Sequence, residues 1–403
     1  MNLKNLLFIT WDSDQTNYLE SLFFPIFSGI QQKSKIRIFV AQFSWAKKEE
    51  VNRIKKIADQ HDLAYFHFRV SRFPHPALGT IKAVLESSYQ LTQLIFQKKI
   101  DILMPRSTIP AMMVNRIKSW IKAHAVQVIY DADGFPIQER VDFAGLNPNG
   151  FQHRYFEKQE NLMLHLSDAV LTRSKRAISI HMKNNPDLER GKFFRVRNGR
   201  DENFFRIDNE KRGERRKELG YKNTDQVWVY TGSLGPAYAW DKLLELLRFF
   251  LFRGENVKLL VLTRTPDFIQ DKLPVDLLER IKLVRTEFSN IPDYLNAGDL
   301  GISLRMPAPS LSGLFPIKLG EYLLTGLPVF ASVQVGDTGE WIKERRGLMG
   351  IDLDEPDFAQ KSYRQWKELS GLDREGLRKW AIEQFSLGKA VRDYLEVFEF
   401  LEK

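Results

Sequence analysis

A lysine and a glutamate three residues apart, Lys318 and Glu321, lie in a segment that predicts a short helix between two turns. Pro316 suits the first position of that helix, where a missing N–H costs nothing, and Gly326 suits the left-handed residue just past its end. A cation in the first turn faces the positive end of the helix dipole, so it is favoured there when an anion is bound nearby. Lys318 therefore indicates a phosphate site, and Glu321 can accept hydrogen bonds from paired hydroxyls such as those of a ribose. The same spacing also fits a surface helix with a local Lys318–Glu321 ion pair.

A glycine turn upstream offers a second contact to phosphate. The strand-like run at 227–231 is followed by Gly232, Ser233, Leu234 and Gly235. Such a turn lets backbone N–H groups approach a phosphate closely, and the next helix adds its N-terminal dipole. Arg264 and Arg305 close two other strand-like runs, at the ends where α/β proteins bind ligands. Each arginine is a candidate cation for the same anion, or else belongs to a surface or interdomain ion pair.

The first half of the chain has polar residues at the ends of two strand-like runs. Arg106 follows the run at 101–105, and Asp131 and Asp133 follow the run at 126–130. We expect these three side chains to face an acceptor, although either aspartate can instead cap the next helix. Carboxylates one residue apart, here and at 12–14, can also hold a divalent ion that carries a diphosphate. That chemistry would leave the cations of the second half without a role, so we predict no metal site.

Strand-like and helical stretches alternate along the chain in two series. The strand-like runs of the first are 6–10, 36–43, 64–70, 101–105, 126–130, 169–174 and 193–197; those of the second are 227–231, 257–263, 281–286, 301–304, 328–332 and 348–351. This pattern predicts an α/β fold with two doubly wound parallel sheets, in Rossmann-like domains that face each other across an interdomain cleft. The pattern restarts near 199–207, so the domains are predicted at 1–200 and 201–385.

Composition agrees with two domains and excludes several classes of protein. The chain has 403 residues, of which 43% are hydrophobic, enough for two cores. No apolar run approaches the roughly 18 residues that span a bilayer, and the N-terminus has no signal cleavage site, so we expect a cytoplasmic protein. There is no cysteine, and the seven histidines are scattered without ligand spacing, which excludes disulfides, thiolate chemistry and a Cys-ligated zinc.

Positive charge is concentrated in the first half. Residues 1–200 carry 30 Lys and Arg against 18 Asp and Glu, whereas residues 201–403 carry 30 against 33. No nucleic-acid-binding motif accompanies this charge, so we expect no nucleic-acid partner. An anionic membrane surface or an anionic acceptor fits it better, and predicts a protein that is peripheral to the inner face of a membrane. A solvated surface without a partner is the other interpretation.

These segments together resemble family-4 retaining glycosyltransferases of the GT-B fold, in a bacterial polysaccharide-type subgroup. The stretch PIKLGEYLLTGLPV at 316–329 is similar to a P-x-K-x-x-E-Y-x-x-x-G-x-P-V pattern of that family. The stretch VRNGRDENFF at 196–205 resembles the family's entry into its second domain. The segment 131–139 resembles the part of the first domain that faces the acceptor. The resemblance also implies that the last helix, within 386–403, returns to the first domain.

The resemblance implies a role for each part of the donor site. Glu321 would hold the nucleotide ribose, Lys318 and the 232–235 turn would meet the diphosphate, and the turn with Ser312, Gly313 and Leu314 would contact the donor sugar in place of a glutamate common in the family. Many relatives have an arginine where this chain has Ser233, so either Arg264 or Arg305 is expected to replace it.

The implied reaction is the retaining transfer of a sugar from a nucleotide diphosphate sugar to a hydroxyl of a glycan or lipid-linked acceptor. The departing phosphate takes the acceptor's proton, so neither a metal, a cofactor nor an enzymic nucleophile is required. A noncatalytic nucleotide- or carbohydrate-binding scaffold of the same fold is the alternative, because it would explain the missing glutamate and arginine. A nucleic-acid-binding protein would explain only the basic first half.

Overall fold

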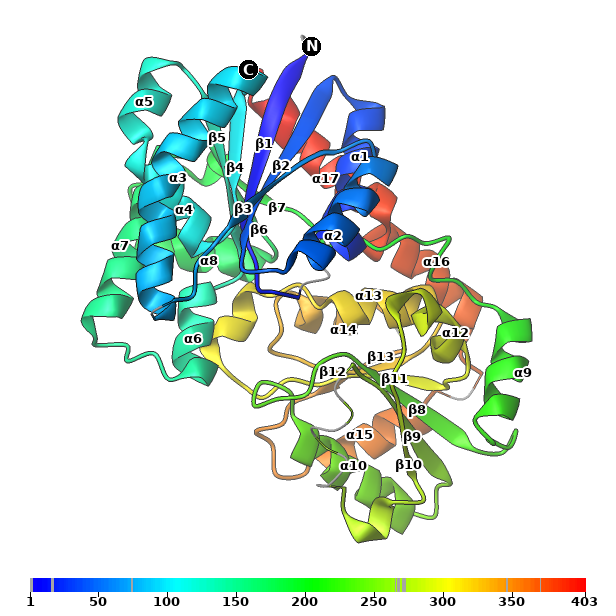
Figure 1. Cartoon of the computed structure of the whole chain (residues 1–403). Helices are drawn as coiled ribbons and strands as arrows, with labels where there is room; N and C mark the ends of the chain where they lie inside the picture. The colour runs from blue at the N-terminus through cyan, green and yellow to red at the C-terminus, as the bar shows by residue number, and fades with distance from the viewer. Residues whose placement is uncertain are drawn as a thin grey trace. The chain divides into compact units, whose positions relative to one another are not determined.

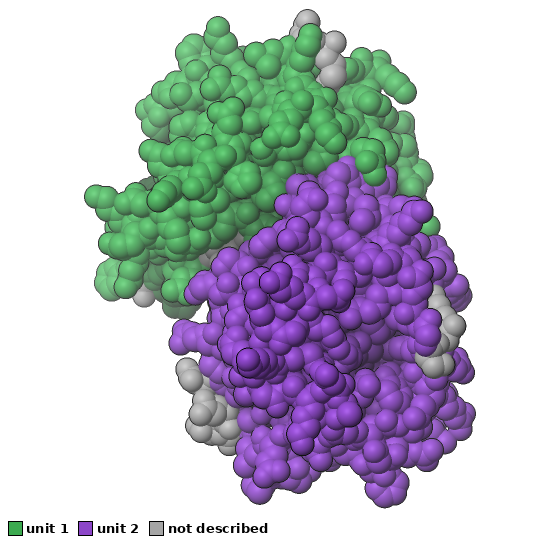
Figure 2. All heavy atoms as spheres, turned by 90° about the vertical axis from the view of Figure 1, so that its right-hand side faces the viewer, with its two compact units in different colours: residues 1–199, 390–403 green, residues 200–389 purple. Residues whose placement is uncertain are grey.

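The computed structural model describes residues 3–15, 18–73, 75–264, 266, 269, 273–345, 347–369 and 371–403. The chain forms two compact units, which Figure 2 colours separately. Unit 1 contains residues 1–199 and 390–403, and unit 2 contains residues 200–389. The last segment of the chain thus belongs to the first unit.

Unit 1 is built on a seven-stranded parallel sheet with strand order β3-β2-β1-β4-β5-β6-β7. The strands are β1 (Lys4–Trp11), β2 (Ile36–Ser44), β3 (Ala64–Arg69), β4 (Ile102–Pro105), β5 (Gln127–Asp133), β6 (Ala169–Thr172) and β7 (Phe193–Arg195). Residues 6–9 of β1 are fully buried, as expected of a central parallel strand covered on both faces.

Helices cover this sheet (Figure 1). They are α1 (Phe24–Lys33), α2 (Lys48–Gln60), α3 (Pro76–Lys98), α4 (Thr108–Arg116), α5 (Lys118–Ala123), α6 (Pro136–Ala144), α7 (Phe151–Leu166), α8 (Lys175–Asn184) and α17 (Leu387–Phe400). Buried residues of α3, α4 and α7, such as Leu91, Met113 and Met163, share one core with the sheet. Helix α17 packs against α1 so closely that a Cβ on Gly29 would lie 2.7 Å from a methyl carbon of Val391.

Unit 2 has the same architecture as unit 1, with a six-stranded parallel sheet of order β10-β9-β8-β11-β12-β13. Its strands are β8 (Gln226–Thr231), β9 (Val257–Leu262), β10 (Ile281–Val284), β11 (Leu300–Ser303), β12 (Val329–Ser332) and β13 (Leu348–Ile351). Its helices include α9 (Asn209–Glu218), α10 (Trp240–Phe252), α12 (Ile291–Asn296), α13 (Ile317–Leu324), α14 (Thr338–Glu344), α15 (Phe358–Lys367) and α16 (Arg374–Phe385).

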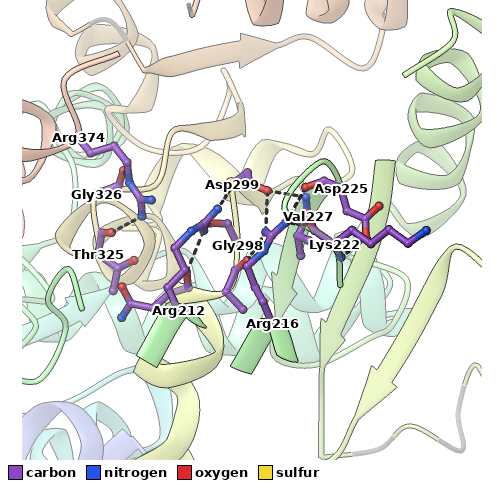
Figure 3. A network of polar contacts seen from close by, with 12 residues as sticks. Arg212, Arg216, Lys222, Asp225, Val227, Gly298, Asp299, Thr325, Gly326 and Arg374 are labelled. Carbon is purple, nitrogen blue, oxygen red and sulfur yellow. Dashed lines mark hydrogen bonds and ion pairs between the residues drawn. The ribbon is translucent and has the colours of Figure 1, made fainter. Parts of the chain in front are cut away.

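Arginines fix the ends of elements in unit 2 (Figure 3). Arg212 and Arg216 of α9 both bind the carboxylate of Asp299, which precedes β11, at 2.6 and 3.2 Å. Arg374 donates to the carbonyl oxygens of Thr325 and Gly326 at 3.2 and 3.1 Å. Since these two carbonyls end α13, Arg374 fixes the C-terminal end of the helix that carries the predicted phosphate site.

The predicted fold class is confirmed: both units are α/β, each with one parallel sheet, and every strand-like run named above corresponds to one strand. Gly326 has the expected left-handed backbone, with φ +69°. Pro316 lies immediately before α13 rather than in its first turn, since its ψ of 98° is extended. Among the described residues, no helix is both long and apolar enough to cross a membrane.

Candidate functional site

Lys318, near the start of α13, lies against the glycine turn that follows β8. Its Nζ is 3.4 Å from the hydroxyl of Tyr230 and 4.4 Å from the centroid of that ring. A Cβ on Gly232 would lie 2.9 Å from the same Nζ, and Gly232 has φ +103°. The backbone conformation favours glycine at this position, and a Cβ here would also displace the end of the Lys318 side chain. The structure thus brings together the lysine and the turn that the sequence singled out.

Tyr238 links Lys318 to a second cation. Its ring centroid lies 4.5 Å from Lys318 Nζ and 4.2 Å from the guanidinium carbon of Arg305. The main chain supports this contact, because Met306 N–H donates to the carbonyl of Ala237 at 3.1 Å. Arg305 N–H in turn donates to Ser332 Oγ at 2.9 Å. Cations over aromatic faces are stabilised without neutralisation of their charge, so both remain able to attract an anion.

The electrostatics of this cluster favour a bound anion. Burial, together with the positive charge of Arg305, lowers the pKa of Lys318 to about 7, although Glu321 opposes the change. An anion placed here would raise that pKa again and hold the lysine in its charged form. Burial raises the pKa of Tyr230 far above its usual value, so its hydroxyl keeps its proton and donates to the Ser233 carbonyl at 2.5 Å.

Arg264, the other candidate cation, has different surroundings. Its side chain is about half exposed at the end of β9, and its Nη2 lies 3.8 Å from Oε2 of the exposed Glu287. Arg305, in contrast, shares the ring of Tyr238 with Lys318.

The carboxylate of Glu321 is buried and bound by an arginine that the sequence analysis did not single out. Arg200 Nη2 donates to Glu321 Oε1 at 2.6 Å, across 121 positions of the chain. The guanidinium of Arg200 also lies over the ring of Phe288, 5.3 Å from its centroid. Arg200 thus holds the carboxylate of Glu321 in one orientation inside unit 2. In the alternative interpretation, a surface helix with a local Lys318–Glu321 ion pair, this carboxylate would be exposed. The only sequence signal for Arg200 is its place directly after Asn198 and Gly199.

The predicted sugar-binding turn forms a short 3-10 segment, Pro309–Gly313, before α13. Ser312 Oγ donates to the carbonyl of Pro309 at 2.7 Å, and Leu314 N–H donates to the carbonyl of Leu311 at 3.1 Å. Gly336 N–H donates to Leu311 at 2.8 Å, which ties the turn to the loop after β12. In the turn after β8, the carbonyl of Gly235 accepts a hydrogen bond from Tyr238 N–H at 2.9 Å, and the side chain of Leu234 packs against the core.

A second charged cluster lies in unit 1, at the carboxyl ends of β4, β5 and β6. Arg106 Nη2 is 2.5 Å from Asp133 Oδ2, and Arg173 Nη2 donates to both carboxylate oxygens of Asp131, at 2.8 and 2.6 Å. Arg173 Nε is 3.4 Å from Asp133 Oδ1. The three acceptor-side residues predicted from the sequence therefore meet, and they are joined by Arg173, which the sequence analysis did not identify.

Backbone strain accompanies this second cluster. Asp133 has φ +61° and Ser107 has φ +67°, and Ser107 N–H donates to the carbonyl of Asp131 at 2.9 Å. Helix α6 begins at Pro136 with no side-chain cap, so neither aspartate has the capping role considered above. Such strain persists only where the surroundings hold it, and it concentrates at functional sites.

Within this cluster of unit 1 the charges balance, since two arginines face two aspartates. Burial tends to raise the pKa of Asp133, but Arg106 and Arg173 outweigh it and hold the pKa below its usual value. Asp131 is fully buried, and Asp133 is partly exposed. A divalent ion at this pair of carboxylates would meet two arginines already in place, which disfavours the D-x-D metal chemistry considered above.

The sequence matches no protein-family model and no curated protein, whereas the structure has many relatives among solved structures. Anabaena HepE (Alr3699), in complex with UDP and glucose, has 14% identity and a TM-score of 0.70, with 98% of this chain and 99% of that chain covered. A glycosyltransferase from Rickettsia africae has 16% identity and a TM-score of 0.69, with all of both chains covered. UDP-GlcNAc 2-epimerase from Neisseria meningitidis, bound to UDP-GlcNAc, has 13% identity and a TM-score of 0.60, with 99% of this chain and 100% of that chain covered. At these identities the similarity establishes the GT-B type of fold.

Proposed function

We propose that this protein is a retaining, metal-independent glycosyltransferase of family 4 that uses a nucleotide diphosphate sugar as donor. The observation that carries the proposal is the pair of cations, Lys318 and Arg305, which face aromatic rings instead of carboxylates beside the glycine turn at 232–235. A diphosphate is the anion that such a pair and a row of backbone N–H groups would bind. The neighbours described in complex with UDP or a UDP-sugar support uridine as the nucleotide.

The mechanism assigns the cations to the leaving group. The transition state of glycosyl transfer has oxocarbenium character, and negative charge grows on the departing phosphate. Lys318, Arg305 and the amides of the 232–235 turn would stabilise that charge, in positions fixed before the reaction. Glu321, oriented by Arg200, would accept hydrogen bonds from the ribose hydroxyls. The departing phosphate takes the acceptor proton, so the protein supplies no nucleophile and no cofactor.

On the acceptor side we propose Arg106 and Asp133, with Asp131 as the residue that holds Arg173 in place. The acceptor is a glycan or a lipid-linked sugar in surface polysaccharide or glycolipid assembly. Charge supports a site at a membrane, because unit 1 carries 31 Lys and Arg against 22 Asp and Glu, whereas unit 2 carries 29 of each. We therefore propose a cytoplasmic protein that associates peripherally with an anionic membrane and not with nucleic acid.

A screen of nucleotide sugars tests the proposal. Binding is measured by calorimetry, and transfer to lipid-linked acceptors is followed by release of the nucleoside diphosphate, with and without a chelator. We expect a UDP-sugar to bind, the chelator to leave turnover unchanged, and NMR of the product to show the anomeric configuration of the donor. Inversion, or activity restored only by Mg²⁺ or Mn²⁺, would contradict the mechanism.

Two other outcomes identify the competing functions. Conversion of UDP-GlcNAc into another UDP-sugar without any acceptor would indicate an epimerase, an activity that the Neisseria meningitidis neighbour makes worth testing. Nucleotide binding without turnover over a broad acceptor panel would indicate the noncatalytic scaffold.

A further inference from the structure

Helix α3 of unit 1, which lies beside the sheet in Figure 1, has a row of large apolar side chains that are exposed to solvent. The row consists of residues that are each 51–80% exposed: Leu78, Ile81, Leu85, Tyr89 and Phe96. Their spacings of three, four, four and seven residues place them on one side of the helix. Phe73, just before the helix, is 85% exposed. We call these six residues the α3 stripe.

The opposite side of the same helix is also apolar. Val84, Leu91, Leu94 and Ile95 are buried and belong to the core that α3 shares with the sheet. The outer face of a surface helix is usually charged or polar, because only one stripe packs against the core. Two apolar sides therefore indicate that the outer one has a partner of its own.

The α3 stripe belongs to a basic segment of the chain. The segment from β3 to the end of α5, residues 64–123, carries nine Lys and Arg against two Asp and Glu. This excess of seven is most of the excess of nine that unit 1 carries. Lys82 lies on α3 itself, Lys98 and Lys99 lie at its end, and Arg116 Nε donates to Ser88 Oγ at 3.1 Å.

We propose that the α3 stripe is a docking surface for an anionic membrane. Helix α3 would lie in the plane of the membrane, with its apolar side chains at the boundary between headgroups and acyl chains. Lys82, Lys98 and Lys99 on and at the end of the helix would lie at the lipid phosphates. A second copy of this chain is a poorer occupant, because it would bring two segments of the same positive charge together, and like charges across an interface repel. The proposal names the surface through which the membrane association proposed above would occur, and it rests on that part of the proposed function.

Flotation with vesicles tests the surface directly. The vesicles contain three parts phosphatidylcholine to one part phosphatidylglycerol, and pure phosphatidylcholine serves as the uncharged reference. We expect the wild-type protein to float with the anionic vesicles at low salt and to be released at high salt. The double variant Leu85→Gln/Phe96→Gln should bind at least about tenfold more weakly, because it removes two exposed apolar side chains that would be buried in the membrane. Lys82→Glu should weaken binding at low salt by roughly fivefold or more.

A matched variant in unit 2 separates the α3 stripe from general hydrophobicity. Phe252 and Val275 are each 86% exposed, so Phe252→Gln/Val275→Gln removes a comparable exposed apolar surface. This control should bind vesicles as the wild type does. Equal losses in both double variants, or wild-type binding by the α3 variants, would overturn the proposal. A wild-type dimer in sedimentation that the α3 variants convert to monomers would also overturn it, in favour of an interface between copies.

Two further measurements keep this result separate from the proposed reaction. Thermal melts show whether the variants fold, and the surface substitution Lys82→Glu keeps the test available if the apolar variants do not. UDP affinity, measured by calorimetry, should be equal in the wild type and the α3 variants. If the protein binds vesicles through α3 but has no transferase activity, the docking surface is supported and only the proposed reaction is contradicted.

Discussion

Arg305 provides the sharpest test of the donor site, because its guanidinium shares the ring of Tyr238 with Lys318 at 4.2 and 4.5 Å. Arg305→Gln removes one of the two side-chain cations proposed to meet the leaving diphosphate. The loss of one preorganised contact to charge that develops in the transition state costs on the order of 3 kcal/mol, which corresponds to a few hundredfold in kcat. Release of UDP, followed over a range of donor concentrations, gives kcat and KM separately.

A second readout reports on the interaction between the two cations. Burial is the main cause of the lowered Lys318 pKa of about 7, and the charge of Arg305 is the next cause. The wild-type kcat/KM should fall as the pH rises through this value, because the lysine of the free enzyme loses its proton. Arg305→Gln removes a nearby positive charge, so the pKa of Lys318 should rise and the alkaline fall of kcat/KM should move to higher pH.

Two variants serve as comparisons for Arg305→Gln. Arg264→Gln tests the other arginine predicted from the sequence, and Arg248→Gln removes an exposed arginine that binds Asp276 at 2.8 Å. We expect both to retain most of the turnover. A loss of a few hundredfold in Arg264→Gln with less than about tenfold in Arg305→Gln would refute the assignment of the second cation. An unchanged pH profile in Arg305→Gln would refute the coupling to Lys318.

Three further predictions concern buried carboxylates. Glu321→Ala should weaken UDP binding by about 1.5–3 kcal/mol in calorimetry without unfolding the protein, whereas unchanged affinity would exclude its role at the ribose. Asp131→Asn should lower the free energy of unfolding in denaturant by about 3–5 kcal/mol, since it removes the carboxylate that accepts both short bonds of the buried Arg173 and leaves the longer 3.4 Å contact with Asp133; a loss below about 1 kcal/mol would contradict this. Burial raises the pKa of Glu160 to about 7 from an ordinary 4.5, so the native state binds its proton more tightly than the unfolded state and loses stability as the pH rises through that interval. Glu160→Gln should flatten this fall between pH 5 and 8 in thermal melts, and an identical slope in both proteins would show that Glu160 titrates normally.

The fold was accessible from the sequence because parallel strands are buried on both faces and appear as short continuous apolar runs. Residues 6–9 of β1 and residues 259–262 of β9 are examples. The ends of elements were less certain, since they depend on local backbone geometry. Pro316 is compatible with the first helical position, yet its extended ψ places it just outside α13.

The arrangement that we propose as the donor site was predictable only where the chain itself fixes the geometry. A glycine turn after a strand and a short helix with defined ends determine the backbone, and this is why Gly232 and Lys318 could be named in advance. Tyr238 and Arg200 act through contacts between distant segments: one ring holds cations from two elements, and one guanidinium binds a carboxylate 121 positions away. Nothing in the local pattern of either residue specifies its partner. The choice between Arg264 and Arg305 was open for the same reason.

The two charged clusters differ in a way that fits the two proposed substrates. In unit 1, Arg106 and Arg173 face two aspartates at 2.5–2.8 Å, so the cluster is close to neutral and offers fixed hydrogen-bonding groups. In unit 2, the carboxylate of Glu321 is bound by Arg200, while Lys318 and Arg305 lie over tyrosine rings. An aromatic face stabilises a cation but leaves its charge available to an incoming anion. Excess positive charge is therefore kept where a diphosphate would bind, and balanced charge where a hydroxyl acceptor would bind.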